Sequence, residues 1–177
     1  MKRFYVLLFG LSFLILISSC SKTIYFSQDM RNNLNKNFLS LDKIQFYNSK
    51  KIILRRNLSY ADTKVARGEI KLIKGQYVEK IIIPKNTPGV AVSEGGNSIS
   101  VAFENGPYRF LKFVLNDENE YQISADKWNN DYGKVKYDTL VYYIEPRSSR
   151  SVLKVIKNDR YNLQKNTRRV KGKMISR

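Results

Sequence analysis

The sequence predicts an all-β domain of antiparallel strands, built as a small barrel or a sandwich. Short runs rich in Ile, Val, Phe and Tyr recur about every ten residues between positions 43 and 157, separated by Gly, Pro and Asn. Within these runs apolar and polar residues alternate, whereas no segment from 43 to 145 repeats with the helical period of about 3.6 residues. The chain of 177 residues is long enough for one such domain with a hydrophobic core.

Strands are predicted wherever an apolar run lies between two turn signals. Gly68 and Gly75 bracket one of these runs, and Pro84 ends another, because proline cannot donate to a strand ladder. The predicted strands, in chain order, are 44–47, 52–58, 68–75, 77–83, a strand near Val90, then 98–103, 109–115, 121–123, 133–137, 140–144 and 152–156.

Four polar or glycine-rich segments are predicted to turn the chain between these strands. Residues 138–139 (Asp-Thr) separate two apolar runs and indicate a tight hairpin. Residues 95–97 (Gly-Gly-Asn), 105–107 (Asn-Gly-Pro) and 116–120 are the others. A phosphate-binding loop at 95–97 is the alternative, but the Gly-Lys-Ser/Thr ending and the following helix that such a loop needs are absent from the sequence. A hairpin turn is therefore the prediction there.

Residues 1–19 have the layout of an export signal. Lys2 and Arg3 precede an uncharged apolar run, and two small residues, Ser18 and Ser19, stand before Cys20. The ending Ile-Ser-Ser-Cys resembles the lipobox of bacterial lipoproteins. This resemblance implies cleavage before Cys20, a diacylglyceryl thioether on its sulfur and acylation of its new amine. A plain transmembrane anchor is the alternative, but the apolar run of about 16 residues is shorter than the ~20 that span a bilayer.

Residues 20–42 are predicted to be a tether between the lipid and the β domain. Met30, Leu34, Phe38 and Leu41 would share one face of a helix. Four asparagines occur at 32, 33, 35 and 37, and asparagine is a poor helix former, so we expect only one weak helical turn.

The middle of the chain resembles the SH3-like barrels of cell-envelope proteins. The segment 81–90 has the strand, Pro/Gly turn and strand of such a module, and Trp128, residues 133–135 and residues 142–143 fit a further hairpin. The resemblance covers about 68–145 and implies a binding module. Two aromatic residues, Trp128 and Tyr142, are the candidates for docking a partner. Trp128 could also stack on a sugar or a peptide, or close the open end of the barrel.

The composition removes several classes of enzyme. The chain has no histidine and a single cysteine, Cys20, which excludes Ser-His-Asp and Cys-His relays, disulfides and ordinary zinc sites. The acidic candidates are Asp117, Glu118, Glu120, Asp126 and Asp131. Two of these carboxylates at a suitable separation could hydrolyse a glycan, and a calcium site is another alternative, although the pattern of an EF-hand loop is missing. A polar turn is the favoured interpretation, and we expect no enzyme activity, metal or cofactor.

The C-terminal segment 158–177 is predicted to be a basic, flexible tail. From position 161 onward it has no acid and little apolar material, so it cannot bury enough surface to fold alone. A solubilising tail without a partner is one interpretation, and attachment to a polyanion or to an acidic protein surface is the other. The candidate binding residues are Lys165, Arg168, Arg169, Lys171, Lys173 and Arg177.

Together these features predict a non-enzymatic accessory lipoprotein of the bacterial cell envelope that binds another envelope protein. The alternative is a basic protein that binds anionic lipid, lipopolysaccharide or another envelope polyanion, and nucleic acid is not expected because export removes the chain from the cytoplasm. Ser21 and Lys22 follow the cysteine, which resembles the lipoproteins that diderm bacteria send to the outer membrane, whereas an aspartate there often retains them in the inner membrane. The expected location is the periplasmic side of the outer membrane; in a monoderm bacterium it would be the outer face of the plasma membrane.

Overall fold

The computed structural model describes residues 23–58, 69–73 and 75–157, which form two antiparallel sheets. The seven-stranded sheet has the order β1-β13-β2-β6-β7-β8-β9. Its strands are β1 (Thr23–Tyr25), β2 (Gln45–Asn48), β6 (Pro88–Glu94), β7 (Ser98–Ala102), β8 (Phe110–Leu115), β9 (Tyr121–Ile123) and β13 (Leu153–Ile156). Among the described residues, the strands are accompanied by one α-helix, α2 (Gln28–Lys36), and two short 3-10 helices, η2 (Leu41–Lys43) and η4 (Pro146–Ser148).

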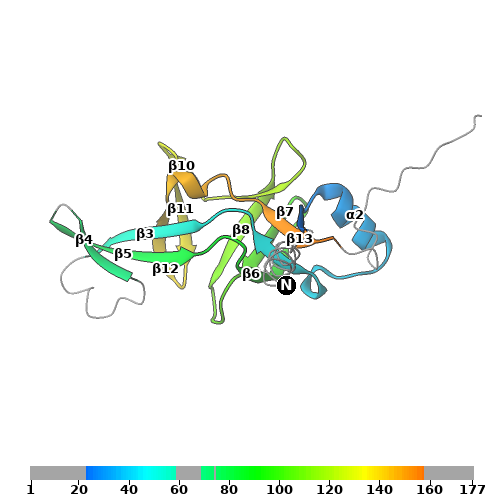
Figure 1. Cartoon of the computed structure of the whole chain (residues 1–177), viewed down its shortest axis with the longest axis horizontal. Coiled ribbons are helices and arrows are strands. Elements are labelled where there is room, and N and C mark those ends of the chain that lie inside the picture. The colour runs from blue at the N-terminus through cyan, green and yellow to red at the C-terminus, as the bar shows by residue number, and fades with distance from the viewer. Residues whose placement is uncertain (1–22, 59–68, 74, 158–177) are drawn as a thin grey trace, which may run out of the picture.

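The six-stranded sheet has the order β10-β11-β12-β3-β5-β4. Its strands are β3 (Ile52–Leu58), β4 (Glu69–Ile73), β5 (Gln76–Ile83), β10 (Lys127–Asn129), β11 (Tyr132–Tyr137) and β12 (Leu140–Ile144). Figure 1 shows that the molecule is elongated, with β3, β4 and β5 extending away from the seven-stranded sheet and from α2. The all-β, antiparallel prediction is confirmed. Within the described residues the two sheets are open, with β1 and β9 at the edges of one and β10 and β4 at the edges of the other, and they do not close into a barrel.

The inward faces of both sheets share one hydrophobic core. The seven-stranded sheet contributes Phe46, Val101 and Phe113, and the six-stranded sheet contributes Leu54 and Ile144, all fully buried or nearly so. Alternation along each strand places these residues on the face toward the other sheet, and their burial supplies the main stabilising free energy of the fold.

Residues 23–42 are part of the domain, so the prediction of a tether there is wrong. Strand β1 pairs with β13 at the edge of the seven-stranded sheet, and Leu34 of α2 and Leu41 of η2 are buried in the core. The Ser27 hydroxyl caps the helix by accepting a hydrogen bond from the Met30 amide at 3.4 Å. Burial of the apolar side of α2 therefore outweighs the low helix propensity of its asparagines.

The predicted helical face is only partly correct. Met30 and Leu34 face the core, but α2 ends at Lys36, and the side chain of Phe38 is 97% exposed. Phe38 has a φ of 55°, so the chain has already left the helix at this residue. Leu41 is buried from η2 instead of from a longer helix.

The predicted turns occur where the sequence indicates them. Asp138 and Thr139, with φ of 49° and 70°, connect β11 to β12 as a two-residue hairpin turn. The amide of Gly95 donates to the Ser98 carbonyl between β6 and β7 at 2.9 Å. Residues 116–120 connect β8 to β9, with the Asn116 amide donating to the Glu120 carbonyl at 2.9 Å. These hairpins fix the strand register and hence the face on which each side chain lies.

Candidate binding surfaces

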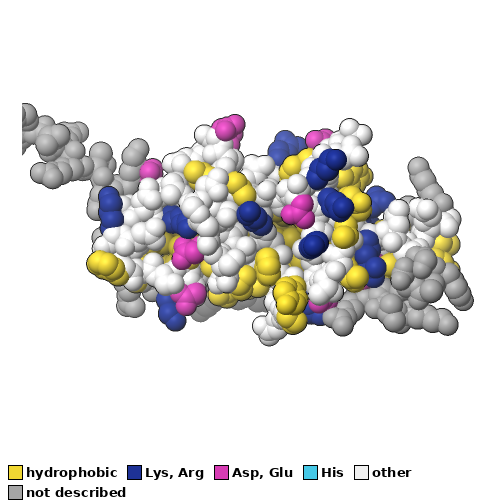
Figure 2. Space-filling model, turned by 180° about the vertical axis from the view of Figure 1, so that it is seen from behind, with side chains coloured by type: hydrophobic (Ala, Val, Ile, Leu, Met, Phe, Trp, Pro, Cys, Tyr) yellow, Lys and Arg dark blue, Asp and Glu magenta, His cyan; other side chains and the backbone are white. Residues whose placement is uncertain are grey.

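The outer face of the six-stranded sheet, directed away from the core, carries a row of basic side chains. Directly paired residues of neighbouring strands project on the same face, so the register places one residue from each of five strands side by side. We call these residues the basic row: Lys127 of β10, Lys134 of β11, Tyr143 of β12, Arg55 of β3 and Lys80 of β5. In Figure 2 the Lys and Arg side chains gather over this part of the molecule, with hydrophobic side chains among them.

Most of the charge in the basic row is not neutralised. Lys80 pairs with Glu145, with Nζ 2.9 Å from Oε1. Lys127, Lys134 and Arg55 form no salt bridge with any residue that the structure describes. Lys136, two positions along β11 from Lys134, lies on the same face and is exposed as well. The row is therefore a surface of net positive charge.

A groove of about 870 Å³ lies beside the centre of the basic row. Its lining combines aromatic rings, amide groups and guanidinium groups, and none of its lining residues is acidic. These residues are Arg55, Arg56, Asn57, Asn129, Asn130, Tyr132, Val141 and Tyr143. We call it the basic–aromatic groove.

Arg55 is held in this groove by contacts that leave its positive charge unpaired. Its Cζ lies 5.8 Å from the ring centroid of Tyr132, within the range of a cation–π interaction. Its Nη2 lies 3.5 Å from Asn57 Oδ1, at the outer limit of a hydrogen bond. Because neither contact neutralises the guanidinium, Arg55 can still bind an anion in the groove.

Of the two predicted docking aromatics, Tyr142 is buried and cannot contact a partner. Its side chain is 2% exposed, and its hydroxyl donates a hydrogen bond to Glu79 Oε2 at 3.1 Å. Arg56 Nε also donates to this oxygen, at 2.6 Å. Burial and the nearby Glu79 carboxylate raise the pKa of Tyr142 to about 12. The next residue, Tyr143, is on the outer face and 43% exposed, so of these two adjacent tyrosines it is the accessible one.

Trp128, the other predicted docking residue, lies on the face opposite to the basic row. It pairs with Gly133, and a Cβ at Gly133 would lie 2.7 Å from Trp128 Cζ3, so the indole covers this glycine. The side chain remains 40% exposed at the edge strand β10. Because the two sheets are open, Trp128 does not close a barrel.

The predicted acidic residues lie in three loops. Asp117, Glu118 and Glu120 lie in the β8–β9 turn, Asp126 precedes β10, and Asp131 lies in the β10–β11 turn. Burial and the neighbouring Glu118 raise the pKa of Glu120. None of these five acids lines the basic–aromatic groove. Among the described residues, no group of three or more acidic side chains is placed to hold a metal ion.

The outer face of the seven-stranded sheet has a different character, because it exposes apolar side chains. The register aligns Gln45, Val90, Ala102 and Phe110 across β2, β6, β7 and β8, and Val90 and Phe110 are 45% and 37% exposed. Val92, at the irregularity in the β6–β7 pairing, is also exposed. We call Val90, Val92, Ala102 and Phe110 the apolar row.

Tyr108 lies on the β7–β8 loop, two residues before Phe110 of the apolar row. Its φ is 59°, which is uncommon for a residue with a bulky side chain, and its side chain is 65% exposed. Two hydrogen bonds to Asp138, in the β11–β12 turn, hold this loop in place. The Asp138 amide donates to the Tyr108 carbonyl at 3.0 Å, and Arg109 Nη2 donates to Asp138 Oδ2 at 3.0 Å. An exposed aromatic ring held in a costly backbone conformation is typical of a functional position.

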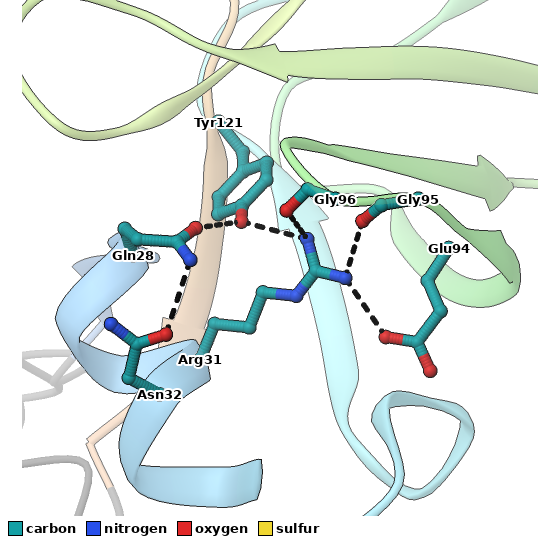
Figure 3. Close-up of polar contacts among 7 residues, drawn as sticks. All are labelled: Gln28, Arg31, Asn32, Glu94, Gly95, Gly96 and Tyr121. Atoms are coloured by element: carbon teal, nitrogen blue, oxygen red, sulfur yellow. Dashed lines mark hydrogen bonds and ion pairs between the residues drawn. The ribbon is translucent and has the colours of Figure 1, made fainter.

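Arg31 fastens α2 to the seven-stranded sheet. Figure 3 shows its guanidinium reaching from the helix to the β6–β7 hairpin, where it donates to the carbonyls of Gly95 and Gly96 at 2.6 and 3.1 Å. It also pairs with Glu94 at 3.1 Å. These contacts offset the free-energy cost of burying an arginine side chain that is only 7% exposed. They also hold the N-terminal helix against the seven-stranded sheet.

Comparison with protein-family models, with curated proteins and with solved structures finds no significant match to this chain. In the part of the chain that the structure describes, no helix is long and apolar enough to cross a membrane. Cys20 and the six basic residues of the predicted tail (Lys165, Arg168, Arg169, Lys171, Lys173 and Arg177) lie outside the described residues.

Sequence reasoning missed the residues of both rows. The alternation in β11 and β12, together with the hairpin at 138–139, would have placed Tyr143 and Lys134 on one face. Arg55 and Lys127 had no comparable signal, because nothing local in the sequence indicates that β3 and β10 lie on either side of that hairpin.

Proposed function

We propose that this chain is a non-enzymatic accessory lipoprotein of the bacterial cell envelope, anchored through Cys20, that binds another envelope protein. The observation that carries the proposal is the apolar row, together with the exposed Tyr108 on the loop that leads into β8. Exposed apolar side chains grouped on one sheet face have the character of the central part of a protein–protein interface.

The other predicted features are compatible with this role. A lipid anchor would hold the domain at a membrane surface, where it meets membrane proteins at high local concentration. The resemblance of residues 68–145 to SH3-like modules supports a binding role, although the open sheets differ from a closed barrel. We place the protein on the periplasmic side of the outer membrane, because Ser21 and Lys22 follow the cysteine.

Photo-crosslinking from intact membranes tests the partner proposal. A photoreactive phenylalanine analogue replaces Phe110 in the apolar row and, in a matched control, Phe38, which is exposed next to α2. We expect Phe110 to yield a discrete crosslinked protein that disappears in the Val90→Asp variant, and Phe38 to yield none. Crosslinks from Phe110 to lipid alone, or no reproducible protein product, would contradict the proposal.

The lipid anchor is tested separately. A Cys20→Ala variant should be released from membranes by carbonate washing, whereas the unaltered chain should remain. A variant that stayed membrane-bound would contradict the lipid anchor.

A second candidate function, binding of an envelope polyanion, is favoured by the basic row. Three cations without a carboxylate partner on one sheet face attract anionic ligands, and the predicted tail would add six more positive charges. This attraction should weaken strongly with salt, because the Debye length is only about 8 Å at physiological ionic strength.

A further inference from the structure

We infer that the basic–aromatic groove is a binding site for an acidic saccharide, a short glycan that carries carboxylate or phosphate groups. This inference gives the polyanion function a defined site and ligand class. It does not depend on the protein partner, because the groove and the apolar row lie on different sheets.

The first argument is the size and shape of the groove. Its volume of about 870 Å³ falls within the ~300–1,000 Å³ typical of sites for small ligands. It lies on the face of regular β strands, and the left-handed φ values of Asn130 and Asp131, 45° and 66°, fix the turn that contributes Asn130 to its lining. The side chains are therefore positioned before a ligand arrives.

The second argument is the type of polar group in the groove. Asn57, Asn129 and Asn130 each have one amide that both donates and accepts hydrogen bonds, as sugar hydroxyls do. Acidic side chains of a peptide offer only acceptors, so they can bond to the NH2 group of an asparagine but not to its oxygen, whereas a sugar hydroxyl can bond to either. The three amides therefore favour a hydroxyl-rich ligand over an acidic peptide.

The third argument is the pairing of aromatic rings with an arginine. Tyr132 and Tyr143 present partly exposed rings, on which the apolar face of a sugar ring can pack. Arg55 supplies a planar guanidinium that can bind a carboxylate or a phosphate in bidentate fashion. Lys134, next to Tyr143 in the basic row but outside the lining of the groove, adds a second positive charge nearby.

A membrane surface and a single-stranded nucleic acid are the competing ligands. Lipid headgroups would be attracted by the lysines alone and would not require the tyrosines or asparagines. Single-stranded nucleic acid also stacks on tyrosines, but the predicted export signal directs the chain away from the cytoplasm. Both ligands are included in the test.

Calorimetric titration of the full mature chain with defined probes tests this inference. The probes are trigalacturonate as the carboxylate sugar, maltotriose 6-phosphate as the phosphate sugar and maltotriose as the neutral control. Poly-glutamate, phosphatidylglycerol vesicles and oligothymidylate represent an acidic protein, a membrane surface and a nucleic acid. We expect one or both acidic sugars to bind and the neutral sugar to bind much more weakly. The acidic sugar that binds better shows which anionic group the groove prefers.

Variants assign the binding to the groove. Arg55→Met should weaken binding of the acidic sugar about tenfold or more, because charge-assisted hydrogen bonds are lost. Tyr143→Leu should weaken it without changing its salt dependence, since it removes a ring and no charge. Lys112→Met removes one exposed cation from the outer face of the seven-stranded sheet and should have little effect.

Three outcomes would overturn the inference. The first is unchanged binding in both Arg55→Met and Tyr143→Leu, which would assign the sugar to a charged surface elsewhere on the chain. The second is equal or tighter binding of poly-glutamate, vesicles or oligothymidylate with the same sensitivity to both variants. The third is equal binding of maltotriose and the acidic sugars. None of these results bears on crosslinking at Phe110, so the two proposals fail independently.

Discussion

Arg31 and Tyr121 are 90 residues apart in the sequence, yet Arg31 Nη1 donates a hydrogen bond to the Tyr121 hydroxyl at 2.9 Å. The same hydroxyl donates to the side-chain oxygen of Gln28, one turn earlier on α2 (Figure 3). Tyr121 is fully buried and packs against Phe26, which precedes the helix. A polar network on the inner side of α2 is thus continuous with the hydrophobic core, and the N-terminal segment folds as part of the domain.

Replacing Arg31 should destabilise the whole domain. Arg31→Met keeps the length of the side chain but removes the donors to Gly95, Gly96, Glu94 and Tyr121. We expect the free energy of unfolding to fall by roughly 1–3 kcal/mol, because the buried Tyr121 hydroxyl loses a donor and the charge-assisted hydrogen bonds that hold α2 on the β6–β7 hairpin are removed. Urea denaturation monitored by circular dichroism measures this change.

The control for this prediction is Arg150→Met, since Arg150 is exposed. It should change the free energy of unfolding by less than about 0.5 kcal/mol. A similarly small effect of Arg31→Met would contradict a structural role for these hydrogen bonds, and a separate early transition would mean that α2 unfolds on its own.

The strands and turns were predictable because their signals are local. Alternation of apolar and polar residues is a property of a few consecutive positions, and so is the Asp-Thr pair at 138–139, whose two residues both adopt a positive φ. Strand β10 was missed, because it has three residues and all of them are exposed. Unlike β9, which also has three residues but has apolar residues at both ends, β10 shows no alternation of buried and exposed positions.

The N-terminal segment and the binding surfaces could not be predicted in the same way, because they depend on contacts between distant residues. Helix α2 is stabilised by the burial of Leu34 and by the contacts of Arg31 with the β6–β7 hairpin. The residues near position 31 indicate neither the burial nor these contacts. The basic row depends on strand order, which brings residues 55 and 134 to either side of Tyr143. A shift of one residue in strand phase also exchanges Tyr142 and Tyr143 between core and surface.

Stability should decrease at alkaline pH because of two buried tyrosines. Burial and Glu79 raise the pKa of Tyr142 to about 12, and burial and Glu104 raise the pKa of Tyr137. A tyrosine in the unfolded chain has a pKa near 10, so above this pH the unfolded state loses protons that the folded state keeps. Between about pH 10 and 12 the free energy of unfolding should therefore fall as pH rises, by at most about 1.4 kcal/mol per pH unit for each group. Below pH 10 these tyrosines should contribute no pH dependence.

Urea denaturation at a series of pH values, with phenolate absorbance as a second readout, measures this effect. Tyr142→Phe should reduce the slope of the free energy of unfolding against pH above pH 10. Because this variant also loses the hydrogen bond to Glu79, its stability at neutral pH is measured first. Tyr143→Phe is the matched control, because it removes a hydroxyl from the outer face and leaves the contacts of Tyr142 with Glu79 in place. Equal slopes in the unaltered chain and in Tyr142→Phe would contradict the prediction.

The contact between Gly133 and Trp128 gives a prediction with a direct spectroscopic readout, because Trp128 is the only tryptophan in the chain. A Cβ at position 133 would lie 2.7 Å from both Ala125 Cβ and Trp128 Cζ3, closer than atoms can approach without displacement. Gly133→Ala should therefore push the indole outward, shift its fluorescence emission to longer wavelength and destabilise the domain by about 1–3 kcal/mol. Gly96→Ala is the control, since a Cβ there meets no atom within 4 Å. Unchanged emission in Gly133→Ala would mean that the indole does not cover this glycine in solution.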